Sequence, residues 1–312
     1  MTVLFYTTFT DKKIWIKEIK KQFKNIKIIT IREKKYFNKV EFAIVWDLPD
    51  KILKQLSNLK IIFSQGAGVD HILNLPSYNN TPIVRLQDPI MAERMANYVL
   101  SQILNYQLHL SKYLKSQQKK IWLDDLETLT PIDNHKLTIG ILGVGFLGNY
   151  VAKFLKKINY NVIGFKKNKT LKKFNYKIYT GYNINKFIYS SDIIVSILPS
   201  TKYTINFINK NFLSKMKKNS LLINVGRGVT INEKDLINHL NKNKNFFASL
   251  DVFNKEPLNT SSKLWSHPNV TITPHIASIT VVKSAIAQMY SRYIQYKKTG
   301  KIKSDVNLNN GY

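Results

Sequence analysis

The sequence predicts an α/β protein of two domains, each built around a parallel β-sheet. The chain has 312 residues, about twice the length of a typical single domain. Hydrophobic residues make up 44% of it, which is enough for two buried cores. Short apolar runs alternate with amphipathic segments along most of the chain, and this alternation is typical of parallel sheets covered by helices on both faces.

The N-terminal part carries five apolar runs that predict strands. Lysine-rich amphipathic segments between them, such as 11–23 and 50–56, predict helices. A longer helical pattern follows over 91–113, and the polar stretch 117–136 predicts a connector or arm. The predicted strands are 3–6, 26–31, 42–46, 61–64 and 83–86.

A second series of strands and helices begins at Leu137. Its apolar runs are TIGIL, NVIGF, KIYTG, DIIVSILP, SLLINVG, NFFASLDV and NVTITPH. The segment 280–298 predicts a last helix that returns to the first module, followed by a short polar tail. We therefore expect a discontinuous domain of 1–100 plus 282–312, interrupted by a second domain of 101–281.

Composition excludes several classes of protein. The chain has no cysteine, which excludes disulfides, a thiolate metal site and a cysteine nucleophile, and we predict no metal site. The formal charge is +29, but only five of the 48 cationic residues are Arg and the lysines are spread over nearly the whole chain. Without a basic tail, we expect no specific nucleic-acid partner. No signal peptide or membrane-spanning run is present, so we expect a soluble cytoplasmic protein.

A glycine-rich turn follows the predicted strand at 138–142. Gly143, Gly145 and Gly148 form the pattern GxGxxG between this strand and a predicted helix. The first glycine permits a tight turn, the second lets the backbone approach a pyrophosphate, and the third lets helix and strand pack closely. The free N–H groups of the helix start favour the phosphates of a dinucleotide.

The end of the next strand bears on the choice of dinucleotide. NAD-binding domains place an acidic residue there for the ribose 2′-hydroxyl, but the sequence here is FKKNK (165–169), and no acidic residue lies between Gly148 and Asp192. We predict that Lys167 and Lys169 bind a 2′-phosphate, with Lys166 as a flanking alternative. NADP(H) is therefore the preferred cofactor, and NAD(H) remains possible.

Three charged side chains follow three predicted strands of the second domain. Arg227 lies in INVGRG, Glu256 in LDVFNKEPL and His275 in TITPHIAS. The carboxyl ends of parallel strands meet at one edge, where open α/β sheets bind ligands. We expect a cation, a carboxylate and an imidazole to meet at this edge.

These segments resemble the signature segments of the D-isomer-specific 2-hydroxyacid dehydrogenases. The layout of the whole chain is similar to the glyoxylate/hydroxypyruvate reductase A group of that family, including FSQGAGVDHI, SILPSTKYTINFIN and the terminal GY. The resemblance implies a doubly wound Rossmann cofactor domain inserted into a smaller, flavodoxin-like substrate domain. It also implies NADPH-dependent reduction of small 2-oxo acids and a homodimer that involves the arm 117–136.

The resemblance also implies roles for individual residues. Arg227 would bind the substrate carboxylate and polarise the C2 carbonyl, His275 would protonate the carbonyl oxygen, and Glu256 would raise the pKa of His275. Asp251 would orient the nicotinamide amide. The cofactor-binding residues are Gly143, Gly145, Phe146, Leu147, Gly148, Lys167, Lys169, Pro199, Thr201, Val225 and Asp251; the substrate-binding residues are Trp46, Ala67, Gly68, Val69 and Arg227.

Several alternatives remain open from the sequence. Trp46 lies either near the substrate or in the core, and His71 is predicted to be a residue of a helix start. A D-lactate type of dehydrogenase is the main alternative enzyme. A non-catalytic NAD(P)-sensing protein is the alternative outside catalysis, although the complete set of Arg, Glu and His argues against it.

Overall fold

The structure is a computed structural model that describes residues 1–168, 171–308 and 311–312, without the side chain of Leu126. The chain divides into a smaller unit, 1–91 with 280–312, and a larger unit, 92–279. The first boundary lies earlier in the chain than the expected 100/101. The reason is that Val99, in the middle of the long helix that follows, packs in the core of the larger unit.

The smaller unit contains a parallel sheet of five strands in the order β2-β1-β3-β4-β5. This order is that of flavodoxin-like domains, as predicted. The predicted strand at 26–31 is shorter in the structure, and so is the one at 83–86. The strands are β1 (Thr2–Tyr6), β2 (Lys27–Ile29), β3 (Val40–Val45), β4 (Ile61–Ser64) and β5 (Ile83–Val84).

Helices cover both faces of this sheet. Trp15 of α1 and Met289 of α11 pack with Phe42 and Phe63 on one face. On the other face, Ile52 of α2 and Ile72 of α3 pack with other strand residues. Strands buried on both faces explain the nearly continuous apolar runs in the sequence. The helices of this unit are α1 (Lys12–Gln22), η1 (Lys34–Lys39), α2 (Asp50–Leu53), α3 (Asp70–Leu73) and α11 (Val282–Thr299).

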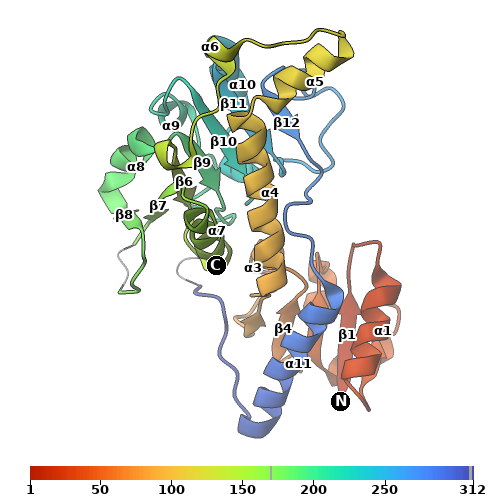
Figure 1. Ribbon diagram of the computed structural model, residues 1–312. Helices are drawn as coiled ribbons and strands as arrows, with labels where there is room; N and C mark the ends of the chain where they lie inside the picture. The colour runs from red at the N-terminus through yellow and green to blue at the C-terminus, as the bar shows by residue number, and fades with distance from the viewer. Residues whose placement is uncertain (169–170, 309–310) are drawn as a thin grey trace. The chain divides into compact units, whose positions relative to one another are not determined.

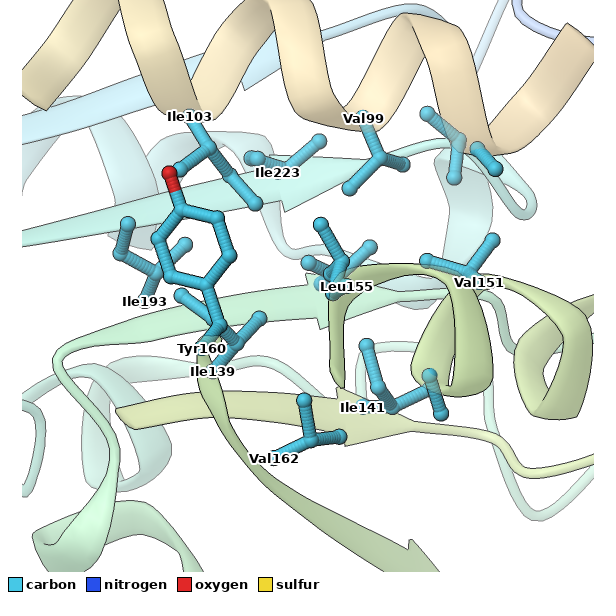
Figure 2. Packing of buried hydrophobic residues seen from close by; sticks show 14 of the residues in the cluster. Val99, Ile103, Ile139, Ile141, Val151, Leu155, Tyr160, Val162, Ile193 and Ile223 are labelled. Atoms are coloured by element: carbon cyan, nitrogen blue, oxygen red, sulfur yellow. The ribbon is translucent and has the colours of Figure 1, made fainter. Parts of the chain in front are cut away.

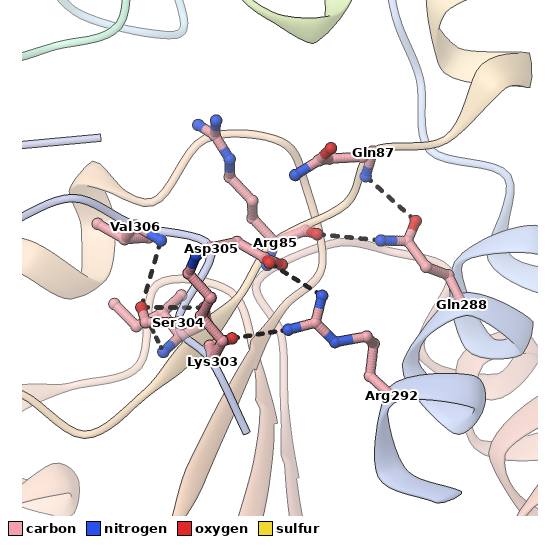
Figure 3. A network of polar contacts seen from close by, with 9 residues as sticks. Arg85, Gln87, Gln288, Arg292, Lys303, Ser304, Asp305 and Val306 are labelled. Atoms are coloured by element: carbon pink, nitrogen blue, oxygen red, sulfur yellow. Dashed lines mark hydrogen bonds and ion pairs between the residues drawn. The ribbon is translucent and has the colours of Figure 1, made fainter. Parts of the chain in front are cut away.

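The C-terminal tail packs along β5. The sequence predicts a short polar tail but not this contact. Asp305 accepts hydrogen bonds from Arg292 Nη1 (2.9 Å) and from the N–H of Arg85 (3.3 Å), as Figure 3 shows. Ser304 Oγ accepts the N–H of Ile83 at 3.3 Å, and Val306 is buried. The tail therefore contacts the open edge of the sheet.

The larger unit contains a parallel sheet of seven strands in the order β12-β11-β10-β9-β6-β7-β8. Read from β8 and numbered within the unit, the order is 3-2-1-4-5-6-7, which begins with the 3-2-1-4-5-6 arrangement of doubly wound nucleotide-binding folds, as predicted. The order reverses between β6 and β9, which is where such folds bind dinucleotides. The strands are β6 (Thr138–Leu142), β7 (Asn161–Lys166), β8 (Lys177–Thr180), β9 (Ile193–Ser196), β10 (Ser220–Asn224), β11 (Phe246–Leu250) and β12 (Val270–Ile272).

Two layers of helices cover this sheet (Figure 1). On one face, Val99 and Ile103 of α4 pack with Leu155 of α7 against Ile139 and other strand residues (Figure 2). On the opposite face lie α8, α9 and α10. The helices are α4 (Pro89–Gln107), α5 (Leu110–Gln118), α6 (Leu126–Leu129), η2 (Asn134–Lys136), α7 (Phe146–Lys157), η3 (Gly181–Asn183), α8 (Ile184–Ser190), α9 (Lys210–Leu213), η4 (Gly228–Thr230) and α10 (Glu233–Lys242).

The helix predicted over 91–113 is broken in two. His109 has a φ of +54°, in the left-handed region, and separates α4 from α5. Apolar periodicity continues across such a break, so the pattern alone could not reveal it. In the part of the chain that the structure describes, no helix is both long and apolar enough to span a bilayer.

Candidate functional site

The glycine turn joins β6 to α7 at the point where the strand order reverses. Gly143 has a φ of +105°, a conformation that side chains rarely adopt. At Gly148, a Cβ would lie 2.2 Å from the carbonyl oxygen of Gly143, so this position requires glycine for close packing. A Cβ at Gly145 would have no atom within 4 Å. The second glycine therefore borders open space, as a site of backbone approach requires.

Main-chain donors at this turn are free to receive an anion. Among the described residues, no hydrogen bond uses the N–H of Gly145, Phe146 or Leu147. These groups belong to the first turn of α7, where N–H groups have no partner within the helix and the helix dipole favours negative charge. The turn fits the pyrophosphate of a dinucleotide.

The lysines after β7 have different surroundings. Lys166 Nζ donates to the carbonyl oxygen of Val144 at 3.3 Å, and burial, with the charge of Lys172, lowers its pKa. Lys167 is exposed, and its ammonium lies 3.3 Å from the centre of the Tyr203 ring. Of the two lysines assigned to a 2′-phosphate, Lys169 lies outside the described residues.

The loop after β9 is a hydrogen-bonded turn. Thr204 Oγ1 donates to the carbonyl oxygen of Pro199 at 2.6 Å and accepts the N–H of Thr201 at 2.9 Å. This turn presents Tyr203 to Lys167 and to the ammonium of Lys202, which lies 5.1 Å from the ring centre. A cationic cluster around an aromatic ring results, and two of its members, Lys202 and Tyr203, were not predicted from the sequence.

The loop after β10 carries Arg227 and packs against two neighbouring loops. Val225 is buried in the core, and its N–H donates to the carbonyl oxygen of Ser196 at 3.0 Å. A Cβ at Gly228 would lie 1.9 Å from the carbonyl carbon of Phe253. Only glycine permits this approach, which brings the Arg227 loop next to the chain that leads to Glu256.

Arg227 is half-buried and its main chain is fixed on both sides. The buried Asn224 donates from Nδ2 to the carbonyl oxygen of Arg227 at 3.1 Å, and its Oδ1 accepts the N–H of Gly226 at 3.3 Å. The guanidinium Nη1 donates to the carbonyl oxygen of Gly226 at 3.1 Å. A guanidinium offers five donors in a planar set whose geometry matches the two oxygens of a carboxylate. Asn224 lies in the INVGRG motif, and the sequence alone does not indicate that it supports Arg227.

His275 and Glu256 form a direct contact at the carboxyl edge of the sheet. His275 Nδ1 lies 2.7 Å from Glu256 Oε2, and Glu256 Oε1 accepts the N–H of Phe253 at 3.0 Å. Because the carboxylate accepts, we assign the proton to Nδ1, which leaves Nε2 for another partner. Both side chains are partly exposed, at 46% for His275 and 37% for Glu256, and therefore accessible to a ligand.

The pKa of Glu256 is lowered from its usual value. Burial alone raises this pKa, but the hydrogen bonds from His275 and from the N–H of Phe253 act in the opposite direction, as do the positive charges of His275 and Arg227. Glu256 is therefore a carboxylate at neutral pH. The electrostatic effect of Arg227 on this carboxyl also places the third predicted residue near the pair.

Asp251 is buried at the end of β11 and holds the loop that carries His275. Its Oδ1 accepts from Thr273 Oγ1 (2.6 Å) and from the N–H of Ile276 (2.8 Å), and its Oδ2 accepts the N–H of Ala277 (2.8 Å). Both carboxylate oxygens are thus engaged within the protein. The family resemblance implies a contact with nicotinamide for this residue, whereas the sequence gives no sign of these bonds, which depend on how the loop folds back.

In the smaller unit, the loop after β4 offers free donors. No hydrogen bond of the described residues uses the N–H of Ala67, Gly68 or Val69. Trp46 lies half-buried at the end of β3, against Gly66, where a Cβ would be 2.6 Å from the indole ring. The predicted substrate residues of this unit therefore share one edge of its sheet.

The order of the strands, the glycine turn and the residues at the strand ends define a dinucleotide-binding protein of the doubly wound α/β class. Residues 100–277 match the family model for the D-isomer specific 2-hydroxyacid dehydrogenase, NAD binding domain. The chain belongs to the D-isomer-specific 2-hydroxyacid dehydrogenase family, which confirms the resemblance drawn from its motifs.

Individual proteins support the same conclusion. Glyoxylate/hydroxypyruvate reductase A of Yersinia enterocolitica is 33% identical over 96% of both chains. A D-isomer specific 2-hydroxyacid dehydrogenase from Xanthobacter autotrophicus, solved with NADPH and MES, is 28% identical with a TM-score of 0.91, covering 100% of this chain and 99% of that one. An NADPH-dependent glyoxylate/hydroxypyruvate reductase from Sinorhizobium meliloti, in complex with NADP and sulfate, is also 28% identical, with a TM-score of 0.90 and the same coverage.

Proposed function

We propose that this protein is an NADPH-dependent reductase of small 2-oxo acids, which converts glyoxylate to glycolate and hydroxypyruvate to D-glycerate. The observation that carries the proposal is the 2.7 Å contact between His275 Nδ1 and Glu256 Oε2. This contact orients an imidazole with Nε2 directed elsewhere, as a proton donor to a carbonyl oxygen requires. The names of similar proteins support the choice of substrates.

His275 carries the proton in this reaction. With both ring nitrogens protonated, Nδ1–H donates to Glu256 and Nε2–H faces the carbonyl oxygen of the substrate. When Nε2 gives its proton to that oxygen, the ring becomes neutral and keeps its bond from Nδ1 to the carboxylate. Glu256 stabilises the charged form of the ring through a charge-assisted hydrogen bond.

Arg227 binds the substrate through its charge and its planar set of donors. A guanidinium binds the two oxygens of a carboxylate and remains charged at every physiological pH. The fixed main chain of Arg227, held by Asn224, orients its side chain. In the smaller unit, the family resemblance assigns the N–H groups of Ala67, Gly68 and Val69 to a substrate carboxylate, and these groups are unpaired among the described residues.

The residues present fit NADP(H). When bound, this cofactor supplies the hydride that reduces C2 of the substrate. The N–H groups of Gly145, Phe146 and Leu147 would hold the pyrophosphate. Lys167 would bind the 2′-phosphate, with Lys169 as the second predicted cation, and the turn from Pro199 to Thr204 would border the cofactor. We propose that Asp251, assigned to the nicotinamide amide by resemblance, acts mainly through the His275 loop.

A direct test is the initial rate of NADPH and NADH oxidation with glyoxylate, hydroxypyruvate and pyruvate. We expect turnover with NADPH on the first two substrates. Arg227→Ala should lower kcat/KM at least about tenfold, because a hydrogen bond to a charged group is lost. Wild-type kcat/KM in Arg227→Ala would refute the assignment of this residue, and cofactor binding without turnover of any 2-oxo acid would favour a binding protein.

We also propose that the protein is a homodimer that involves the arm 117–136. Trp122 in this arm is 91% exposed, and Ile121 next to it is 54% exposed. Neighbouring apolar side chains of this size are typical of interfaces. Light scattering after gel filtration should give twice the chain mass of 36.2 kDa, and Trp122→Ser should shift the protein toward the monomer. A wild-type monomer at micromolar concentration would contradict this proposal.

A further inference from the structure

The loop Gly66–Val69 is held by hydrogen bonds to its carbonyl oxygens. Ser64 Oγ donates to the carbonyl oxygen of Gly68 at 2.9 Å, and the N–H of Leu86 donates to that of Gly66 at 3.2 Å. A peptide unit is planar and trans, so its N–H points away from its C=O. The two bonds therefore fix the directions of the N–H groups of Val69 and Ala67, which are among the three free donors of the loop.

Ser64 is fully buried at the end of β4, and its hydroxyl has three partners. Besides Gly68, these are the N–H of Gly66, at 3.3 Å, and Nε2 of His71, also at 3.3 Å. The hydroxyl has one proton and two lone pairs. The hydroxyl donates its proton to the Gly68 carbonyl and accepts the N–H of Gly66 with one lone pair. Its second lone pair can only accept, so the contact with His71 requires a proton on Nε2 of that ring.

The other ring nitrogen of His71 determines whether such a donor exists. The N–H of Asp47 donates to His71 Nδ1 at 3.2 Å, so Nδ1 carries no proton. A neutral ring then carries its proton on Nε2, facing Ser64. Donors and acceptors match along the whole path from Asp47 through His71 and Ser64 to Gly68. We call this path the His71 relay.

Neighbouring groups hold His71 in this position. The Trp46 and His71 rings lie 4.2 Å apart between centroids, and Phe9 stacks on Trp46 at 5.2 Å. Asp47 has a φ of +52°, and its carboxylate accepts from Thr8 Oγ1 at 3.1 Å. Asp47 and Trp46 follow β3, whereas Ser64 ends β4, so the relay joins two strand ends.

We propose that His71 is a positioning residue for substrate binding. Through the relay, it fixes the Gly68 carbonyl and thereby directs the N–H group of Val69 toward the carboxylate of the 2-oxo acid. This inference rests on the proposed function, which assigns that N–H group to the substrate. The sequence predicts His71 only as a residue of a helix start, because its partner Ser64 lies in another element.

The first test is the protonation state of His71 in the wild-type holoenzyme. Two-bond ¹H–¹⁵N spectra of protein labelled at histidine should show a neutral ring protonated at Nε2. The N–H of Asp47 should exchange slowly with solvent in the wild type and faster in His71→Leu. A ring protonated at Nδ1 would overturn the relay, and this result does not depend on any catalytic activity.

The second test compares His71→Leu, His71→Gln and Ser64→Ala in steady-state kinetics. The N–H groups bind a carboxylate that does not change in the reaction, so the variants should affect binding more than chemistry. We expect the KM for glyoxylate to rise about tenfold in His71→Leu and Ser64→Ala, with kcat and the KM for NADPH within about twofold of wild type. His71→Gln, which restores an N–H donor, should recover most of the loss.

A purely structural role predicts a different result. It would lower the melting temperature and change both KM values and kcat together, without recovery in His71→Gln, and this outcome would overturn the proposal. If the wild type reduced no 2-oxo acid, the proposed function would fail, whereas the tautomer and amide exchange would still decide whether the relay holds the loop. If a variant did not fold, the wild-type spectra would remain decisive.

Discussion

The main-chain oxygen of Asp251 accepts the N–H of His275 at 2.8 Å, while the carboxylate of Asp251 accepts the next two N–H groups of the same loop. His275 has a φ of +56°, in the left-handed region. A non-glycine residue adopts this conformation only when its surroundings stabilise it. Asp251 supplies those surroundings and thereby sets the direction of the imidazole.

We therefore predict that Asp251→Asn impairs catalysis more than cofactor binding. The amide group would face an N–H donor of the loop, and an unsatisfied donor costs about 1–3 kcal/mol. The melting temperature should fall and kcat should drop at least about tenfold, with little change in the KM for NADPH. Asp192→Asn is a matched control, because Asp192 accepts the N–H of Thr138 at 2.8 Å at the amino ends of the strands, away from the site. Equal loss of stability with unchanged kcat in both variants would contradict this role.

Glu256 should give the protein a contribution to stability that depends on pH. Its pKa is lowered in the folded state, so the carboxylate stabilises the fold above the unfolded pKa, and this contribution disappears as pH falls through the folded pKa. Glu256→Gln should therefore be less stable than the wild type at neutral pH, with a difference that shrinks in acid. Urea unfolding at several pH values measures it, and a difference that grows toward low pH would show the opposite sign.

The same substitution should also reduce the rate. Glu256→Gln removes the negative charge that stabilises protonated His275, and general acid catalysis contributes about 10²–10⁴-fold. We expect kcat at neutral pH to fall within that range. Steady-state kinetics with saturating glyoxylate and NADPH measure the loss; a wild-type kcat in Glu256→Gln would argue that the pair of Glu256 and His275 does not act as the acid.

Lys167 should affect the choice between NADPH and NADH. Its ammonium lies over the ring of Tyr203, and together with Lys202 these residues form the cationic cluster. Lys167→Ala should raise the KM for NADPH about tenfold and leave that for NADH nearly unchanged, since only NADPH carries the 2′-phosphate. Lys177→Ala is the control, because Lys177 lies at the amino end of β8, whereas Lys167 follows the carboxyl end of the neighbouring β7. Equal effects on both cofactors would contradict the assignment.

Two glycines of the phosphate-binding turn should respond differently to alanine. Gly145→Ala has open space for its Cβ, so we expect a normal melting temperature but weaker NADPH binding, because the methyl group occupies the approach of the pyrophosphate. Gly148→Ala would place its Cβ 2.2 Å from the oxygen of Gly143, and it should lower the melting temperature. Thermal unfolding and fluorescence titration with NADPH separate the two effects. Unchanged NADPH affinity in Gly145→Ala would argue against the site.

Much of the fold and of the candidate site could be predicted from the sequence because local chemistry determines it. Strands buried on both faces must be nearly continuous apolar runs, and a turn with a φ of +105° at Gly143 requires glycine. Arg227, Glu256 and His275 follow strands, and parallel strands end at a common edge. Their short motifs therefore indicated one site before any distance was known.

The support of these side chains depends on contacts between distant parts of the chain. The partners of Asp251 lie 22 to 26 residues away, and those of the C-terminal tail on β5 lie about 220 residues away. The spacing of apolar residues likewise does not predict the break in the long helix at His109. Hydrogen-bond partners that are distant in the sequence produce no local sequence pattern. Each of these residue types is common, and its supporting role depends on a partner that only folding brings close. Local motifs therefore indicate which residues carry the chemistry, whereas long-range contacts establish which residues orient them.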